Sequence, residues 1–214
     1  TIQSGFSTPN HIVLNNITEI LDINISNNPF VTEFSLPNVE SARNVTITGN
    51  GALTNSLSVQ FDNLRSLSRL QATNNVRISL INMPILESAT RLDITRNQRI
   101  VNIQVPNLTS TGNINISQNQ TLASIQFPNL TNANNIVIGG WSNINLDLQY
   151  ILFPSLLSVN ELQIRTNTYI EDIQFNSLES ASYLYISGPS GATLQSLSFN
   201  QLTNVTNSLS VSHH

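Results

Sequence analysis

Pairs of apolar residues recur along the whole chain, and one residue, polar in most cases, separates the two members of each pair. They are arranged around an aliphatic anchor position, as in Phe127-Pro128-Asn129-Leu130. One pair lies five and three residues before each anchor, and a second pair lies six and eight residues after it. A spacing of two places both side chains of a pair on one face of a β-strand. The pattern therefore predicts two short strands in each repeat rather than a helix.

The anchors divide the chain into repeats of nearly constant length. They are Ile17, Val39, Leu64, Leu86, Leu108, Leu130, Leu156, Leu178 and Leu202, at intervals of 22, 25, 22, 22, 22, 26, 22 and 24 residues. A small or aliphatic residue lies three positions after each anchor, which completes the spacing of a leucine-rich repeat. One such coil cannot bury its apolar faces alone, whereas stacked coils share a continuous core. We therefore predict an all-β, right-handed parallel β-solenoid of about nine 22-residue leucine-rich-like coils.

The same register defines the domain organisation. Residues 1–11 are an N-terminal lead-in without the pattern of a signal peptide. Residues 12–212 form a single solenoid domain, and residues 213–214, both His, resemble the remnant of a purification tag. In the last coil the pattern shifts by one residue, to Leu209 and Val211. Because solenoids normally carry a polar terminal cap, the uncapped last coil predicts either end-to-end self-association or covering by residues beyond the given sequence.

Amide side chains recur at fixed places in the repeat. Eleven residues after the anchor the chain has Asn28, Asn50, Asn75, Asn97, Asn119 and Asn167. An amide array can bind a ligand, but an Asn directed inward at a turn can also pair with backbone groups of the next coil, and we favour that interpretation. A second column, four residues before the anchor, predicts an amide ladder on a sheet surface. It contains Gln60, Asn82, Gln104, Gln126 and Gln174.

The recurrent unit Phe-Pro-Asn-Leu-x-Ser/Asn-Ala-x2-Leu-x-Ile-x2-Asn resembles the repeats of the fungal GPI-anchored cell-wall-organisation family, which includes sporulation-specific members. Those repeats are similar in turn to receptor L domains. The resemblance covers residues 12–211. It implies a secreted, glycosylated protein that is linked to the cell wall and needed for wall integrity.

The composition narrows the range of partners. Charged residues make up 9% of the chain, against about a quarter in typical globular proteins. The net charge is −4 and no basic tract occurs, so nucleic acid is not an expected partner. No apolar run approaches the ~20 residues of a membrane-spanning helix. The sequence has no Cys, which removes disulfides and thiol chemistry and leaves the redox compartment open.

The residues that catalysis would need are scattered. Glu40, Glu87 and Glu179 share a column but lie in non-adjacent coils, whereas a glycosidase needs two facing carboxylates. His11 lies before the first coil, where a surface role is expected. The sequence has no cluster of His and carboxylates with metal-ligand spacing. We therefore predict a non-enzymatic protein without a metal or cofactor.

Candidate binding residues lie on the outward side of the strand after the anchor and in one irregular coil. Two arginines stack in adjacent coils, although a solvated ion pair is the simpler interpretation, and exposed tyrosines favour contact with sugar or protein. The irregular coil replaces the expected turn by Gly139-Gly140-Trp141 and is four residues longer. Insertions of this kind often form a binding loop, but the Trp could also fill a widened core. The candidates are Trp141, Asp147, Tyr150, Tyr169, Tyr183, Tyr185, Arg69 and Arg91.

Eight Asn-x-Ser/Thr sequons occur, which is close to the chance expectation for this composition. Asn24 and Asn115 are expected to face outward because each lies between two inward residues, and Asn119 is expected to face inward. The glycosylation candidates are Asn16, Asn24, Asn44, Asn107, Asn115, Asn129 and Asn204.

These patterns favour a non-enzymatic extracellular protein of the cell surface or cell wall, which acts as a structural or interaction module. Its expected partner is a cell-wall polysaccharide or a surface protein. An alternative is a carbohydrate-binding, lectin-like domain with an aromatic site. A third function, ice binding, is suggested by a column of short hydroxyl side chains that Gly139 and Arg165 interrupt. The column contains Ser26, Thr48, Thr73, Thr95 and Ser117.

Overall fold

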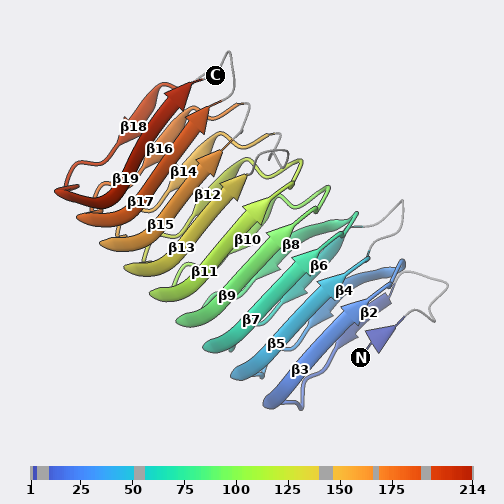
Figure 1. Cartoon of the computed structure of the whole chain (residues 1–214). Coiled ribbons are helices and arrows are strands. Elements are labelled where there is room, and N and C mark those ends of the chain that lie inside the picture. Colours follow the sequence, from blue (N-terminus) through green and yellow to red (C-terminus); the bar gives the residue numbers. More distant parts are fainter. Residues whose placement is uncertain are drawn as a thin grey trace.

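In the computed structural model the chain is an elongated stack of parallel strands, with its two termini at opposite ends (Figure 1). The structure describes residues 2–3, 10–50, 56–139, 147–165, 169–188 and 194–213. Within these ranges every regular element is a strand, so no helix is present that could cross a membrane. The predicted all-β fold is confirmed.

Three parallel sheets form the walls of the solenoid. Sheet A contains, in spatial order, β1 (Ile2–Gln3), β3 (Glu19–Ser26), β5 (Ser41–Thr48), β7 (Ser66–Thr73), β9 (Ser88–Thr95), β11 (Ser110–Ser117), β13 (Asn132–Gly139), β15 (Ser158–Arg165), β17 (Ser180–Gly188) and β19 (Asn204–His213). Sheet B contains β2 (Asn10–Val13), β4 (Val31–Ser35), β6 (Leu57–Gln60), β8 (Ile78–Asn82) and β10 (Asn102–Gln104). Sheet C contains β12 (Ser124–Gln126), β14 (Tyr150–Leu152), β16 (Asp172–Gln174) and β18 (Ser196–Ser198).

The strand register is the one that the anchor spacing predicts. Ile114 of β11 lies opposite Leu92 on one side and Ile136 on the other, each 22 residues away. From β3 to β19, nine strands of sheet A follow one another, which makes about eight full turns of the solenoid. In the last coil the register shifts after Ala181, so that Leu184 pairs with Leu209 and Ile186 with Val211. The predicted one-residue shift is therefore correct.

The core is continuous along the stack axis. Every coil except the last contributes its anchor and both apolar pairs to it, and Leu130, Ile125 and Ile136 are all buried. Four phenylalanines three residues before their anchors, Phe127, Phe153, Phe175 and Phe199, form a stacked column with ring centroids 5.1, 5.1 and 5.5 Å apart. Such regular stacking follows from the strand spacing of about 4.8 Å.

A ladder of buried Asn side chains crosses the turns that follow sheet A. The residue before each Asn has a positive φ, as at Asn27 and Gly49, and this left-handed turn directs the next side chain inward. From Asn50 to Asn119, each Asn then accepts a hydrogen bond from the backbone N–H of the Asn one coil earlier, at 3.0 to 3.2 Å. The interpretation of these residues as structural partners of the next coil is confirmed for Asn28, Asn50, Asn75, Asn97 and Asn119. Asn167 lies outside the described residues.

The surface opposite sheet A differs from the expectation in two ways. It is divided into two sheets, B and C, between β10 and β12. Within each sheet, backbone bonds join successive coils, as from Met83 N–H to Gln104 O at 2.9 Å and from Phe127 N–H to Leu152 O at 3.1 Å. Among the described residues, no equivalent bond joins Val105 N–H to Gln126 O. The predicted amide ladder on this surface is wrong. Gln60 bonds to Ser58 and Gln174 bonds to Asp172, each within its own coil, and among the described residues no side-chain hydrogen bond joins members of the column.

Each strand of sheet A bends at the fourth residue after the anchor. That residue is absent from the pairing in successive coils. In β5, for example, Ala42 and Val45 are buried while Arg43 and Asn44 between them both point outward. The bend follows from the three-residue step between inward positions, since strict alternation would allow only an even step. The bends of neighbouring strands together make the outer surface of sheet A concave.

The last strand leaves apolar side chains uncovered. Leu209 and Val211 of β19 are 59% and 57% exposed. They belong to the edge strand of sheet A, whose outer backbone groups face no further described strand. End-to-end self-association through this edge stays a prediction.

Leu130→Ala is expected to lower the free energy of unfolding by about 2–5 kcal/mol, because Leu130 is fully buried and the deletion leaves a cavity in the core. Leu157→Ala is the control, since Leu157 is largely exposed, and it should change stability by less than about 0.5 kcal/mol. Denaturant titration followed by circular dichroism measures both. An equal, small effect of the two variants would show that the anchor register is wrong.

Asn97→Ala is expected to cost at least about 2 kcal/mol, because it leaves several buried groups without partners. Asn97 Oδ1 accepts from Asn75, and its Nδ2 donates to Ala72 O and Asn119 Oδ1, both at 3.0 Å. The exposed Asn24→Ala supplies the reference in the same denaturant titration. The ladder would have no structural role if both substitutions had the same effect.

Candidate functional site

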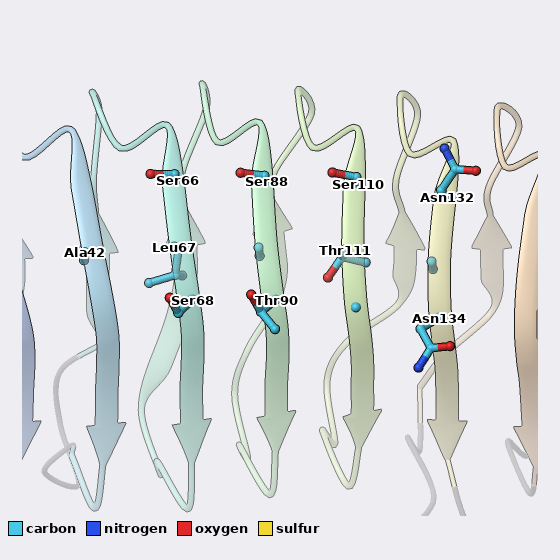
Figure 2. Close-up of a pocket in the computed structure, with 13 residues that line it drawn as sticks. Ala42, Ser66, Leu67, Ser68, Ser88, Thr90, Ser110, Thr111, Asn132 and Asn134 are labelled. Carbon is cyan, nitrogen blue, oxygen red and sulfur yellow. The ribbon is translucent and has the colours of Figure 1, made fainter.

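The bends in sheet A together form a groove that runs along the stack axis, across β5, β7, β9, β11 and β13 (Figure 2). Its volume is about 650 Å³. We call it the hydroxyl groove. It is lined by Ala42, Ser66, Leu67, Ser68, Ser88, Ala89, Thr90, Ser110, Thr111, Gly112, Asn132, Ala133 and Asn134.

The floor and the two walls of the groove come from three adjacent positions of the repeat. The floor is the third residue after each anchor, as in Ala89 and Ala133, which are nearly buried. One wall is the residue before it, and the other wall is the residue after it. In Figure 2 the hydroxyls of Ser66, Ser88 and Ser110 form one row and point in the same direction. The walls therefore present short polar side chains on both sides of a mostly apolar floor.

The coil of β11 interrupts this regular arrangement. Its floor residue is Thr111, where the other lining coils have Ala or Leu. Thr111 is only 8% exposed, and its Oγ1 has no hydrogen-bond partner among the described residues. The next wall position is Gly112, and a Cβ there would lie 2.5 Å from the carbonyl oxygen of Thr90. At this coil the floor residue thus carries an unpaired polar atom, which its neighbours shield from solvent, and one wall position has no side chain.

None of the thirteen lining residues is ionisable or aromatic. The groove therefore offers hydroxyl and amide groups, which both donate and accept hydrogen bonds, without a fixed charge. Sequence reasoning missed this site because it considered the outward columns further along each strand. The available signal was the small residue three positions after the anchor, with Ser or Thr on each side of it.

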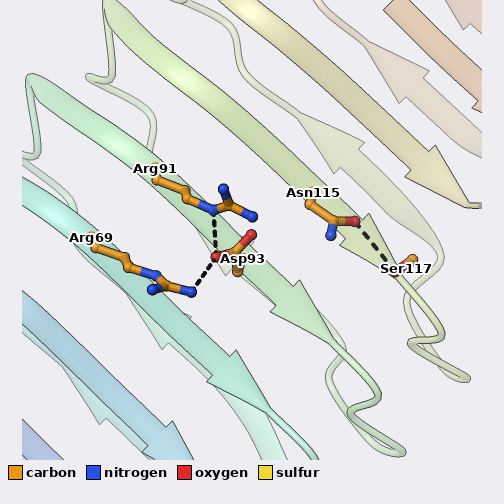
Figure 3. Close-up of polar contacts among 5 residues, drawn as sticks. All are labelled: Arg69, Arg91, Asp93, Asn115 and Ser117. Carbon is orange, nitrogen blue, oxygen red and sulfur yellow. Dashed lines mark hydrogen bonds and ion pairs between the residues drawn. The ribbon is translucent and has the colours of Figure 1, made fainter.

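The predicted pair Arg69 and Arg91 forms an ion-pair cluster with Asp93 (Figure 3). Arg69 Nη2 lies 3.1 Å from Asp93 Oδ2, and Arg91 Nε lies 2.7 Å from the same oxygen. The Asp93 side chain is only 7% exposed, whereas the arginines are 45% and 47% exposed. The hydrogen bond with Asp93 raises the pKa of Arg91 above its ordinary value. Asp93 thus neutralises part of the charge of two arginines that lie directly opposite each other.

Two of the predicted tyrosines lie together on sheet A. The rings of Tyr183 and Tyr185 in β17 stack with centroids 6.2 Å apart, and the Arg165 guanidinium lies over Tyr185 at 5.5 Å. Five strand spacings, about 24 Å, separate β17 from the strand of Arg69. The structure therefore does not bring the predicted arginines and these tyrosines into one site.

The remaining candidates lie on or near the opposite wall. Tyr150 begins β14 of sheet C, and its hydroxyl donates to Glu171 Oε2 at 3.3 Å. The charge of Glu171 raises the pKa of Tyr150 above its ordinary value. Asp147 is exposed in the turn before β14, and Tyr169 is 54% exposed. Trp141, on which the recognition-loop hypothesis depended, lies outside the described residues.

The sequon residues differ in the freedom of their side-chain amides. Asn16, Asn24 and Asn204 are exposed. By contrast, Asn107 and Asn129 donate their Nδ2 to Pro84 O and Pro106 O, both at 2.9 Å. The side-chain amides of two further sequon residues also form hydrogen bonds. Asn44 donates to Asp22 Oδ1 at 2.7 Å, and Asn115 accepts from Ser117 at 3.3 Å. Asn119 is buried, as expected.

The hydroxyl column considered for ice binding is partly recessed. Ser26 and Ser117 are buried, and Ser117 bonds to Asn115 within its own coil (Figure 3). The exposed hydroxyl plane is therefore interrupted at both ends of the column. His11, whose surface role was expected, lies 2.7 Å from Glu33 across β2 and β4 in an exposed pair.

Comparisons with protein-family models, with curated proteins and with solved structures find no match to this chain. The likeness to fungal cell-wall repeats consequently stays a prediction, and function must be argued from the geometry of the chain.

Asp93→Ala is expected to destabilise the protein by about 1–2 kcal/mol at low salt, somewhat below the full value of a buried charged hydrogen bond because both arginines are half exposed. In 1 M NaCl the Debye length is about 3 Å, so salt screens the repulsion between Arg69 and Arg91. The loss of stability should therefore be smaller at this salt concentration. Asp62→Ala, at an exposed position, is the control. Denaturation midpoints at the two salt concentrations measure the difference, and a salt-independent loss would argue against this role of Asp93.

Proposed function

We propose that the chain is a non-enzymatic binding module of a cell surface or cell wall, and that its hydroxyl groove binds a neutral, hydroxyl-rich polymer such as a cell-wall polysaccharide. The observation that carries the proposal is the groove itself. It crosses five coils, its walls are hydroxyl and amide side chains, and none of its lining residues is charged.

The chemistry of the groove suits a sugar polymer better than a charged ligand. An anion or cation would find no counter-charge among the lining residues, whereas sugar hydroxyls can both donate to and accept from Ser, Thr and Asn. Water molecules can bridge the longer contacts at little cost in free energy. The apolar floor, with Ala42, Ala89 and Ala133, can pack against the C–H groups of a sugar ring.

The open shape of the groove also favours binding over catalysis. Hydrolysis of a glycosidic bond needs two carboxylates on opposite sides of the bond, and the lining contains no acidic residue. A shallow groove along a repeating axis instead allows many weak contacts with one long chain.

The rest of the solenoid supports a structural role at a cell surface or in a cell wall. Hydrogen bonds between neighbouring strands and along the Asn ladder join every coil to the next in the direction of the axis. An extracellular location is part of the proposal, and the resemblance of the repeats to wall proteins supports it. The exposed sequon residues Asn16, Asn24 and Asn204 are accessible to glycosylation in that compartment.

Ser110→Arg is expected to weaken polysaccharide binding at least tenfold, because a long charged side chain at this exposed wall position obstructs the centre of the groove. Co-sedimentation with insoluble β-1,3-glucan, cellulose, chitin and mannan measures binding, and the wild-type protein should bind at least one of them. Ser180→Arg is the matched control. Ser180 occupies the same position of the repeat in β17, beyond the groove, and its substitution should leave binding unchanged.

Two results would contradict the proposal. Either the wild-type protein sediments with none of the four polysaccharides, or Ser110→Arg and Ser180→Arg bind equally well. Circular dichroism of both variants serves to confirm that they remain folded.

A further inference from the structure

We infer that the ligand of the hydroxyl groove is an extended β-1,4-linked glycan that lies parallel to the stack axis, with its register fixed by a hydrogen bond to Thr111. This inference rests on the proposed function and adds to it the linkage of the polymer, its direction and the residue that positions it.

The strand spacing determines which polymer fits. The wall side chains repeat once per strand, at about 4.8 Å, along a line that crosses the strands of sheet A. A β-1,4-linked chain of hexopyranoses is nearly straight and advances by close to one strand spacing per sugar. Successive sugars in such a chain are turned over relative to each other, so wall groups two coils apart, such as Ser66 and Ser110, can meet equivalently oriented sugars. A β-1,3-linked chain curves and leaves this line after a few sugars.

A regular groove alone cannot hold a regular polymer in one place. Because successive sugars of a β-1,4-linked chain are turned over relative to each other, shifting the glycan by two sugars, which spans two coils, would restore the same contacts at another place in a regular groove. Register therefore requires a coil that differs from its neighbours. Among the five coils that line the groove, the coil of β11 is the one with a polar floor residue, Thr111, and with a wall position that lacks a side chain, Gly112.

Thr111 has the properties of a hydrogen-bonding group that awaits a partner. It is more than nine-tenths buried in the groove floor, and its Oγ1 has no partner among the described residues. Buried hydroxyls in proteins are usually paired, so that an unpaired one at a groove calls for an explanation. In Figure 2 its side chain lies in the floor row, on the side toward β9. In this rotamer Oγ1 is shielded from solvent, and rotation about χ1 to another staggered position can direct it toward a sugar.

Gly112 leaves the wall beside Thr111 without a side chain. At this wall position the coils of β7, β9 and β13 place Ser68, Thr90 and Asn134, and the coil of β5 places Arg43, which is not part of the groove lining. At β11 the backbone approaches Thr90 O so closely that a Cβ would meet it at 2.5 Å. Beside Thr111 this wall therefore consists of backbone alone, and no side chain at that position blocks the approach of a sugar hydroxyl.

The test compares a β-1,4-linked glucose hexasaccharide with its β-1,3-linked counterpart, using isothermal titration calorimetry on the wild-type protein, Thr111→Val and Ser180→Arg. We expect the β-1,4-linked hexasaccharide to bind more tightly. Thr111→Val should weaken its binding about three- to tenfold, the effect of losing one neutral hydrogen bond. Its denaturation midpoint should be unchanged or higher, because Val has nearly the shape of Thr and removes an unpaired hydroxyl. A purely structural hydroxyl would instead make Thr111→Val less stable.

A spin label at the reducing end of the β-1,4-linked hexasaccharide tests the register directly. In the wild-type protein it should broaden the backbone amide signals at one end of the groove, whereas in Thr111→Val the broadening should spread over several coils. If binding persists but neither affinity nor broadening changes in Thr111→Val, or if the β-1,3-linked hexasaccharide binds as well, the inference is wrong and the proposed function stands. If the wild-type protein binds neither hexasaccharide nor any of the four polysaccharides, the proposed function fails as well.

Discussion

The structure depends on one constraint, which is that the backbone groups of each strand, and of the turn that follows sheet A, find their partners in the neighbouring coils. Strands of sheet A bond to the strands on either side. At the turn, where regular pairing ends, the Asn side chain takes over. The backbone N–H of Asn75, for example, is buried and finds its acceptor in Asn97 Oδ1, one coil away. A single coil would leave such groups without partners, at a cost that no local contact offsets.

This constraint acts along the axis and leaves the length of each coil free. The coil between Val39 and Leu64 has three extra residues and the coil between Leu130 and Leu156 has four, yet Val45 still pairs with Leu70 and Ile136 with Leu162. The register is preserved because the apolar pairs and the backbone bonds specify it locally. Additional residues can therefore be inserted between strands without moving the core, and surface features can change from coil to coil on a constant frame.

The sequence allowed the fold to be predicted because the inward positions are strictly periodic. The anchors, the two apolar pairs and the inward Asn column each repeat with the coil, and all follow from the requirement for a shared core. The groove could not be predicted in the same way. It arises where the strand bends between Ala42 and Val45, so its depth depends on backbone geometry and on the size of side chains in adjacent coils. The predicted binding residues failed to converge for a related reason. Tyr150 and Tyr183 occupy different positions of the repeat, so they lie on different walls although both are exposed aromatics.

Repetition has a further consequence for recognition. A surface made of identical coils can bind a repeating polymer with many equal contacts, but it cannot select one position along that polymer. Position requires a coil in which the pattern is broken, and a break in the core would weaken the stacking on which every coil depends. The floor of a shallow groove avoids this conflict, because Thr111 replaces an apolar residue at the margin of the core while Ile114 and Ile116 in the same strand keep their pairing on both sides. The cost is limited to one unpaired hydroxyl, and a ligand that bonds to it recovers that cost on binding. A solenoid of this kind can thus combine a uniform frame with a local site.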